Sequence, residues 1–289
     1  MSLKPKVITV LVVLVAGLMV FDYSQNHPEQ IAKWTQSLSR GEVVENLHTE
    51  IFTPGGLRAK IESINANLTA KGVVEQTNQH RLQFGKMALK ENAYLNQMAL
   101  LKVQDMFANQ YFEHISPTGK GPADLAKQTG YAYISVGENL ALGNYKDDAE
   151  LVEAWMNSPG HRANILNGKF TEIGVAVLKG KFEGKTTWLA VQEFGRPVTE
   201  CPKVDEFLKS QIDSNTQEIN ELEQQVNQAK MEIESAVEPT SKEELNSYNQ
   251  KVEAYNALIK VFNNRIDQQK DVVFRFNSQV KAFNECIGE

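Results

Sequence analysis

Two histidines stand in similar local sequences, each beside a Ser-Pro pair at a predicted turn. His114 lies in "YFEHISPTGKG" and His161 lies in "SPGHRANIL". Loops are where a folded scaffold presents functional groups, and neutral imidazoles from two separate loops can share a divalent metal ion. A single histidine at such a turn is just as well explained as a hydrogen-bonding partner of its own loop. The hypothesis of a site therefore depends on the two imidazoles converging.

Two carboxylates stand next to strand-like runs, from which either can point into a cleft. They are Glu138 in "VGENLALG" and Glu193 in "VQEFG". A carboxylate in such a place serves as a metal ligand, as a partner that orients a ligating imidazole, or as a general base. Ser116 and Ser158 stand beside the histidines and are nucleophiles in principle, but Ser-Pro more often marks a turn. The sequence contains no His-Glu-x-x-His motif, Gly-x-Ser-x-Gly motif, phosphate loop or dinucleotide-binding fingerprint.

Four motifs in order resemble the bacterial branch of the CAP superfamily, also called the SCP or YkwD-like domain. The resemblance covers roughly residues 68–197, which is less than half of the chain. Any one motif alone is weak evidence, whereas the ordered set is specific. The four motifs are "NQYFEHISPTGKGPADLAKQTGY", "VGENLALG", "AWMNSPGHRANILNGKFTEIGVAV" and "WLAVQEFG".

The resemblance implies a central cleft lined by two histidines and two acidic residues, which can hold a divalent metal, most often zinc. By motif, His114 matches the first histidine, Glu138 of "GEN" the first acid, and His161 of "GHR" the second histidine. These three are the implied metal ligands, and Glu138 is the candidate general base. The second acid is absent between Trp155 and His161, and Glu193 has no matching position in the family pattern. The predicted cleft residues are His114, Ser116, Glu138, Asn139, Ser158, His161 and Glu193.

The predicted elements around these motifs form a mixed α and β domain over residues 68–200. Thr69 is a plausible N-cap for the first helix, and Gly85 is a plausible stop. Helices are predicted within 69–85, 89–112, 121–131 and 147–158, and strands within 133–143, 171–180 and 186–195. Mixed helices and strands predict an α+β layered domain, and the resemblance specifies an α-β-α sandwich.

The N-terminus predicts export. Lys4 and Lys6 precede the uncharged run "VITVLVVLVAGLMVF", residues 7–21. A helix of this length spans roughly 22 Å, short of the ~30 Å hydrocarbon core, which suits a secretory signal. Because no clean Ala-x-Ala site follows, residues 1–23 are predicted to be either a cleaved signal or a membrane anchor. The protein is then anchored at the extracytoplasmic face, or secreted. Residues 24–67 are a polar lead-in in which we find no chemistry.

A heptad pattern fills residues 201–289. Apolar residues recur at alternating steps of three and four from Leu208 to Ile233 and from Leu245 to Phe283. The sequence "EPTS" at 238–241 interrupts the pattern, and Ser241 with Glu244 forms a capping box for the second helix. The simplest structure is an antiparallel helical hairpin, with self-association through the heptads as the alternative.

The chain has two cysteines, Cys201 and Cys286, one at each end of the predicted hairpin. A sparse pair in an exported chain suits a disulfide, and two free thiols are the alternative. Cys201 stands 37 residues before Glu238 and Cys286 stands 48 after it, a difference of 11 residues or about 16 Å of helix. Either the second helix bends back near "QQKDVV", or the pair is not bridged.

Three functions are compatible with these features. A net charge of −6 without a basic stripe argues against nucleic acid as a partner. The first function is a binding module, tethered through the N-terminal segment, that presents a metal-containing cleft to a lipid, glycan or peptide of the cell envelope. The second is a metal-dependent hydrolase acting on envelope material. The third is a structural surface protein, in which the anchor and the hairpin hold the domain at a set distance from the membrane. The exposed faces of the hairpin suit either solvent or a partner helix.

Overall fold

The computed structural model describes residues 50–287, which divide after Cys201 into two units. The predicted signal or anchor at residues 1–23, and most of the lead-in, lie outside the described residues. Within 50–287, no helix combines the length and the apolar character that a membrane crossing requires.

A mixed six-stranded sheet is the centre of the first unit. Its long strands are β4 (Tyr133–Leu142), β5 (Glu172–Phe182) and β6 (Lys185–Pro197), and β6 pairs antiparallel with both of the others. The strand order is β1-β4-β6-β5-β3. The short strands β1 (Glu50–Phe52) and β2 (Leu57–Arg58) both pair parallel with the outer edge of β4, and β3 (Lys90–Glu91) pairs parallel with β5.

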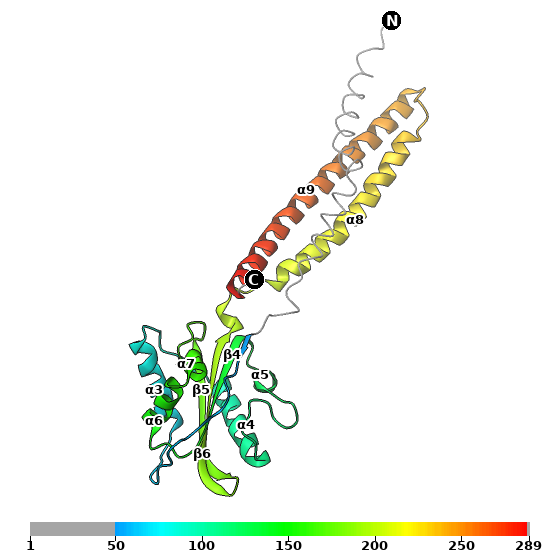
Figure 1. Ribbon diagram of the computed structural model, residues 1–289. Coiled ribbons are helices and arrows are strands. Elements are labelled where there is room, and N and C mark those ends of the chain that lie inside the picture. Colours follow the sequence, from blue (N-terminus) through cyan, green and yellow to red (C-terminus); the bar gives the residue numbers. More distant parts are fainter. Residues whose placement is uncertain (1–49, 288–289) are drawn as a thin grey trace. The chain divides into compact units, whose positions relative to one another are not determined.

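Helices cover both faces of the sheet (Figure 1). One face carries α3 (Ala70–Gln83), α6 (Asp148–Met156) and α7 (Pro159–Ile165), and the other carries α4 (Ala93–Asn109) and α5 (Pro122–Thr129). A short 3-10 helix, Val198–Glu200, ends the unit. The predicted α+β class and α-β-α sandwich are therefore confirmed.

Local signals in the sequence explain where α3 begins and ends. The Thr69 hydroxyl accepts the Gly72 N–H at 3.0 Å, as expected of an N-cap, and Gly85 has a φ of +67° just beyond the helix.

Strand β4 carries side chains to both layers of the sandwich. Val136 and Leu140 pack beneath α4 and α5, whereas Ala141 packs with the α3 and α6 layer. Because side chains alternate along a strand, Glu138 shares the face of Val136 and Leu140, and Asn139 shares the face of Ala141. The Gly-Glu-Asn motif thus sends its acid to one layer and its amide to the other.

The second unit is the predicted antiparallel hairpin, formed by α8 (Glu206–Glu234) and α9 (Lys242–Ile287), which run side by side (Figure 1). Most of the heptad residues form its core, whereas Leu245 is exposed near the turn and Phe283 is only partly buried. The Ser241 hydroxyl accepts the Glu244 N–H, and the Glu244 carboxylate accepts the Ser241 N–H, both at 3.1 Å. This reciprocal pair is the predicted capping box.

Both cysteines, Cys201 and Cys286, are disulfide-bonded. The expected bend in the second helix is wrong, because α9 is continuous through residues 268–273. Residues 201–205 are not helical, and the backbone at Cys201 and Asp205 is extended. Five extended residues span about 16 Å, whereas the same five residues in a helix would span about 7 Å. The extended approach to α8 therefore removes about half of the apparent mismatch in length.

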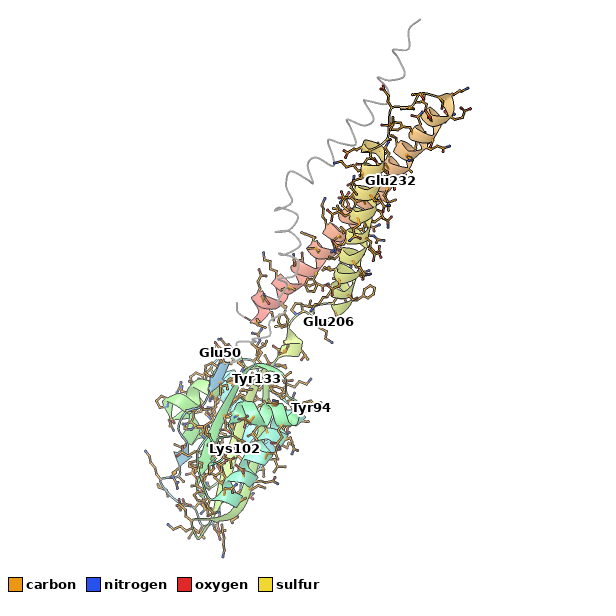
Figure 2. All side chains as sticks on the ribbon, turned by 90° about the vertical axis from the view of Figure 1, so that its right-hand side faces the viewer. Glu50, Tyr94, Lys102, Tyr133, Glu206 and Glu232 are labelled. Carbon is orange, nitrogen blue, oxygen red and sulfur yellow. The ribbon has the colours of Figure 1, made fainter. Side chains whose placement is uncertain are left out.

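The lead-in differs from the expectation at its C-terminal end. Residues 24–67 were expected to be irregular and without chemistry, but Glu50–Phe52 and Leu57–Arg58 are strands of the sheet. Glu50 and Tyr133 lie at the same end of β4 (Figure 2), in agreement with the pairing of Glu50 with Ser135.

Candidate functional site

Two buried carboxyl groups face each other across the sheet. Glu138 of β4 pairs in register with Glu193 of β6, and neither residue is exposed to solvent. Like charges directly opposite one another destabilise a sheet. Burial, and then the charge of Glu138, raise the pKa of Glu193 well above its usual range. Burial therefore favours the protonated form of Glu193 beside Glu138, and Glu138 Oε2 and both Glu193 carboxyl oxygens are buried without a hydrogen bond.

His114 lies in the loop after α4 and contacts oxygen atoms through both ring nitrogens. Its Nδ1 is 2.5 Å from Glu138 Oε1, and its Nε2 contacts the Pro54 carbonyl oxygen. A carbonyl oxygen can only accept, so Nε2 must carry a hydrogen. A second proton lies between Nδ1 and the Glu138 carboxyl group. His114, oriented by Glu138 at Nδ1, therefore donates its Nε2–H to the Pro54 carbonyl oxygen.

Lys102 of α4 is a site residue that the sequence analysis missed. Its Nζ donates to the His114 carbonyl at 2.6 Å and to the Tyr111 hydroxyl at 3.3 Å, and only 1% of the residue is exposed. Burial lowers the pKa of Lys102, whereas the negative charge of Glu138 acts in the opposite direction. Figure 2 labels this residue on α4. A signal was present, because Lys102 stands on the apolar face of the predicted helix, four residues from both Met98 and Met106.

His161 lies in the first turn of α7, whose N-cap is Ser158. Its Nδ1 is 2.8 Å from the Ser158 hydroxyl, and its Nε2 is buried with no hydrogen-bond partner. Burial, followed by the positive charge of His114, lowers the pKa of His161 to about 4. At neutral pH the ring is therefore uncharged. When Nδ1–H donates to Ser158, Nε2 presents an unused lone pair.

Buried amides hold α7 against β4. Asn139 Nδ2 donates to the His161 carbonyl at 3.2 Å and to Gln192 Oε1 at 3.1 Å. Asn164 Nδ2 donates to Asn139 Oδ1 at 3.0 Å, and Gln192 Nε2 donates to the Thr77 hydroxyl at 2.6 Å. Asn139 was a predicted cleft residue, and its role is to position the backbone of His161. Asn164 was missed, although it follows His161 by three residues on the same helix.

The two serines take local roles. The Ser116 hydroxyl is 2.9 Å from the Thr118 hydroxyl and accepts the Lys120 N–H at 3.0 Å, so it braces its own turn. The hydrogen bond of the Ser158 hydroxyl within the predicted cleft set is to His161 Nδ1. Of the predicted set, His114, Glu138 and Glu193 are brought together directly, while His161 is close enough to respond to the charge of His114.

The geometry does not fit the implied metal ligands as they stand. Within residues 50–287, no three His, Cys, Asp or Glu side chains are grouped so that they could hold a metal ion. Both nitrogens of His114 are engaged, and His161 Nε2 is the one ring nitrogen of this pair without a partner. A metal held by His114, Glu138 and His161 would require Pro54 to leave His114.

A cavity of about 470 Å³ lies on the α4 and α5 side of the domain. Asp105, Tyr111 and Lys120 are among its lining residues, and Lys102, which also lines it, donates to the His114 carbonyl. The cavity is therefore adjacent to the buried carboxyl pair but distinct from the surface around His161.

Residues 74–194 match the model of the CAP family, described as the cysteine-rich secretory protein family. The uncharacterized protein YkwD of Bacillus subtilis is 46% identical over 118 residues, which are 41% of this chain and 44% of that protein. The uncharacterized membrane protein YlbC of the same organism is 34% identical over 107 residues, which are 37% of this chain and 31% of that protein. The chain thus spans less than half the length of these relatives.

Solved structures with a similar region include an extracellular SCP-domain protein from Bacillus anthracis. It is 29% identical with a TM-score of 0.38, and the match covers 44% of this chain and 40% of that one. An outer surface protein from Borrelia burgdorferi is 21% identical with a TM-score of 0.38, and the match covers 44% of this chain and 91% of that one. The match with the CAP family model lies within the α-β-α domain, from α3 to β6. Residues 74–194 are therefore similar to the CAP family in sequence.

Proposed function

We propose that this protein is an exported, membrane-tethered binding module whose CAP domain presents the His114, Glu138 and His161 site to a ligand of the cell envelope. The observation that carries the proposal is His161 Nε2, a buried ring nitrogen that lacks a hydrogen bond and belongs to an uncharged imidazole. Such a nitrogen is a ready acceptor for a ligand N–H or O–H group.

Buried polar atoms without hydrogen bonds reduce the stability of the fold, and their concentration at this site supports a functional role. Ten buried side-chain nitrogen and oxygen atoms in the described residues lack a hydrogen bond, and four of them belong to Glu138, His161 and Glu193. Each such atom costs about 1–3 kcal/mol when it is not satisfied. Clusters of this kind, with perturbed pKa values, concentrate at functional sites.

Export and tethering rest on the uncharged run at residues 7–21. Zinc remains a prediction that requires Pro54 to move away from His114. The hydrolase hypothesis makes Glu138 the general base, but its two oxygens face His114 and Glu193, so nothing favours that role over binding. The α8–α9 hairpin is equally compatible with a binding module and with a purely structural protein, so it does not favour either hypothesis.

The proposal predicts that ligand binding depends on His161. Soluble muropeptides and phosphatidylglycerol vesicles are titrated separately against the full chain and its His161→Phe variant, with binding followed by calorimetry. At least one probe should bind the wild-type chain and bind the variant at least about tenfold more weakly, because one buried hydrogen bond is lost.

The matched control is Ser116→Ala, which lies in the same domain but braces its own turn. This variant should bind as the wild type does, and thermal melting should show that both variants are folded. The proposal is wrong if no probe distinguishes the His161→Phe variant from the wild-type chain.

A further inference from the structure

Residues 50–58, here called the strap, lie along the outer edge of β4 beside the site. β1 pairs Glu50–Phe52 with Ser135–Gly137, and β2 pairs Leu57–Arg58 with Ala141–Leu142, both in parallel. The strap is thus a short extended peptide added to the edge of the sheet. This is the geometry by which sheet edges bind peptides from other chains.

The pairing breaks opposite the site. Five steps along the chain separate Phe52 from Leu57, but four separate Gly137 from Ala141, so the strap has one extra residue there. Pro54 lies in this break and has no N–H to give to the sheet. Its carbonyl oxygen instead contacts His114 Nε2. The strap therefore leaves the sheet where its backbone meets the imidazole.

The site holds the strap mainly through backbone carbonyl groups. Asn164 Nδ2 donates to the Phe52 carbonyl at 3.1 Å, and His114 Nε2 donates to the Pro54 carbonyl. Any extended peptide offers carbonyl groups with this spacing. The two donors are thus arranged to recognise a peptide main chain.

Three positions of the strap add side-chain requirements. The Phe52 ring packs edge-on against Phe170, with 5.8 Å between centroids. The Arg58 guanidinium lies over the Phe112 ring at 5.2 Å. A Cβ at Gly56 would lie 2.6 Å from the Phe112 ring, so a larger residue there would have to displace that ring. The groove is therefore suited to a peptide with an aromatic residue, a glycine four positions later and a basic residue two positions beyond it.

The strap is held by a short ladder and by a few side-chain contacts. The strap pairs with β4 through five residues. The Lys169–Glu50 ion pair, at 2.6 Å, joins two exposed side chains and so contributes little to stability. We propose that the strap is an intramolecular occupant of the binding groove, and that the ligand is an extended peptide of another chain that replaces it. This inference rests on the proposed function, because it names the ligand class and the regulation of the same site.

The test uses a labelled peptide of strap sequence, EIFTPGGLR, with blocked termini, and follows its binding to the full chain by fluorescence anisotropy. The double variant Glu50→Gln and Arg58→Ala loosens the strap without changing His114, Asn164 or His161. The peptide should bind this variant about tenfold more tightly than the wild type, because the apparent affinity rises with the fraction of open sites. The matched control Arg275→Ala removes an exposed arginine of α9 and should leave the affinity unchanged.

Peptide variants test specificity without any effect on folding. A peptide in which alanine replaces the residue equivalent to Phe52, or a scrambled peptide, should bind the loosened variant at least about tenfold more weakly. Equal binding by the wild-type chain and the loosened variant, or by the native and scrambled peptides, would overturn the inference.

Muropeptides and vesicles, titrated against the same loosened variant with and without His161→Phe, separate the two proposals. If a muropeptide or the vesicles bind and this binding is lost with His161→Phe, while the strap peptide does not bind, the proposed function stands and the peptide inference is wrong.

Discussion

Replacing Gly174 by alanine is expected to lower the free energy of unfolding of the α-β-α domain by about 3 kcal/mol or more. A Cβ at this position of β5 would lie 2.1 Å from the Leu95 carbonyl carbon and 2.2 Å from the Asn96 nitrogen. Both are backbone atoms of α4, so no rotamer change relieves the clash. Asn96 Oδ1 also accepts the Val175 N–H at 2.9 Å, which fixes the close approach of helix and strand. Chemical denaturation followed by circular dichroism measures the loss.

Gly168→Ala is the matched control for this prediction. A Cβ there would have one neighbour, the Lys86 Nζ at 3.9 Å, so the stability should change by about 0.5 kcal/mol or less. Similar stabilities for the two variants would show that α4 does not lie against β5 as described.

Arg81→Lys is expected to destabilise the same domain by about 3 kcal/mol although it keeps the charge. The Arg81 guanidinium, 2% exposed, donates to four backbone carbonyls. These belong to Met87, Ile165, Asn167 and Phe170. A lysine ammonium is compact and cannot reproduce the planar fork, so at least two buried carbonyls lose their donor. The loss is measured from urea unfolding curves.

This variant also tests how α7 is held. Ile165 ends α7, the helix that carries His161, so the loss should appear as faster amide exchange in α7 before global unfolding. Arg275→Lys on the exposed surface of α9 is the control and should be within about 0.5 kcal/mol of the wild type. An Arg81→Lys variant as stable as this control would contradict the described role.

Much of the fold could be predicted because its local signals agree with its packing. Thr69 and Gly85 bracket α3, and the heptad residues of 201–289 form the core of the hairpin. The strand β4 was found from its motif, although burial on both faces removes the alternation that marks a half-exposed strand. The short strands were missed, because two or three residues carry no periodicity and their pairing is set by contacts distant in sequence.

The site was predicted in part. The motifs indicated His114, Glu138 and His161, but not that Pro54 would meet His114 from 60 residues away. Lys102 was overlooked as one residue within an apolar helix face. Ser116 braces its own turn, as its Ser-Pro pair indicated, because the hydroxyl of a turn residue bonds most readily to the nearby backbone.

His161 links the site to pH. Its pKa is lowered to about 4 in the fold from the ordinary value of 6.5, so below pH 6.5 the unfolded chain binds more protons than the native one. The stability that depends on a neutral His161 is therefore fully present above pH 6.5 and is lost as the pH falls toward 4. The loss is on the order of 3 kcal/mol.

The most direct test of the account is the protonation of His161, followed by ¹⁵N NMR of the imidazole in the full chain and in its His114→Gln variant. The claim is that His161 is buried beside a positively charged His114, with Nε2 unprotonated. The account predicts a neutral His161 down to about pH 5 in the wild-type chain, and a higher pKa when His114 is replaced. A His161 that titrates near 6.5 in both proteins would contradict it.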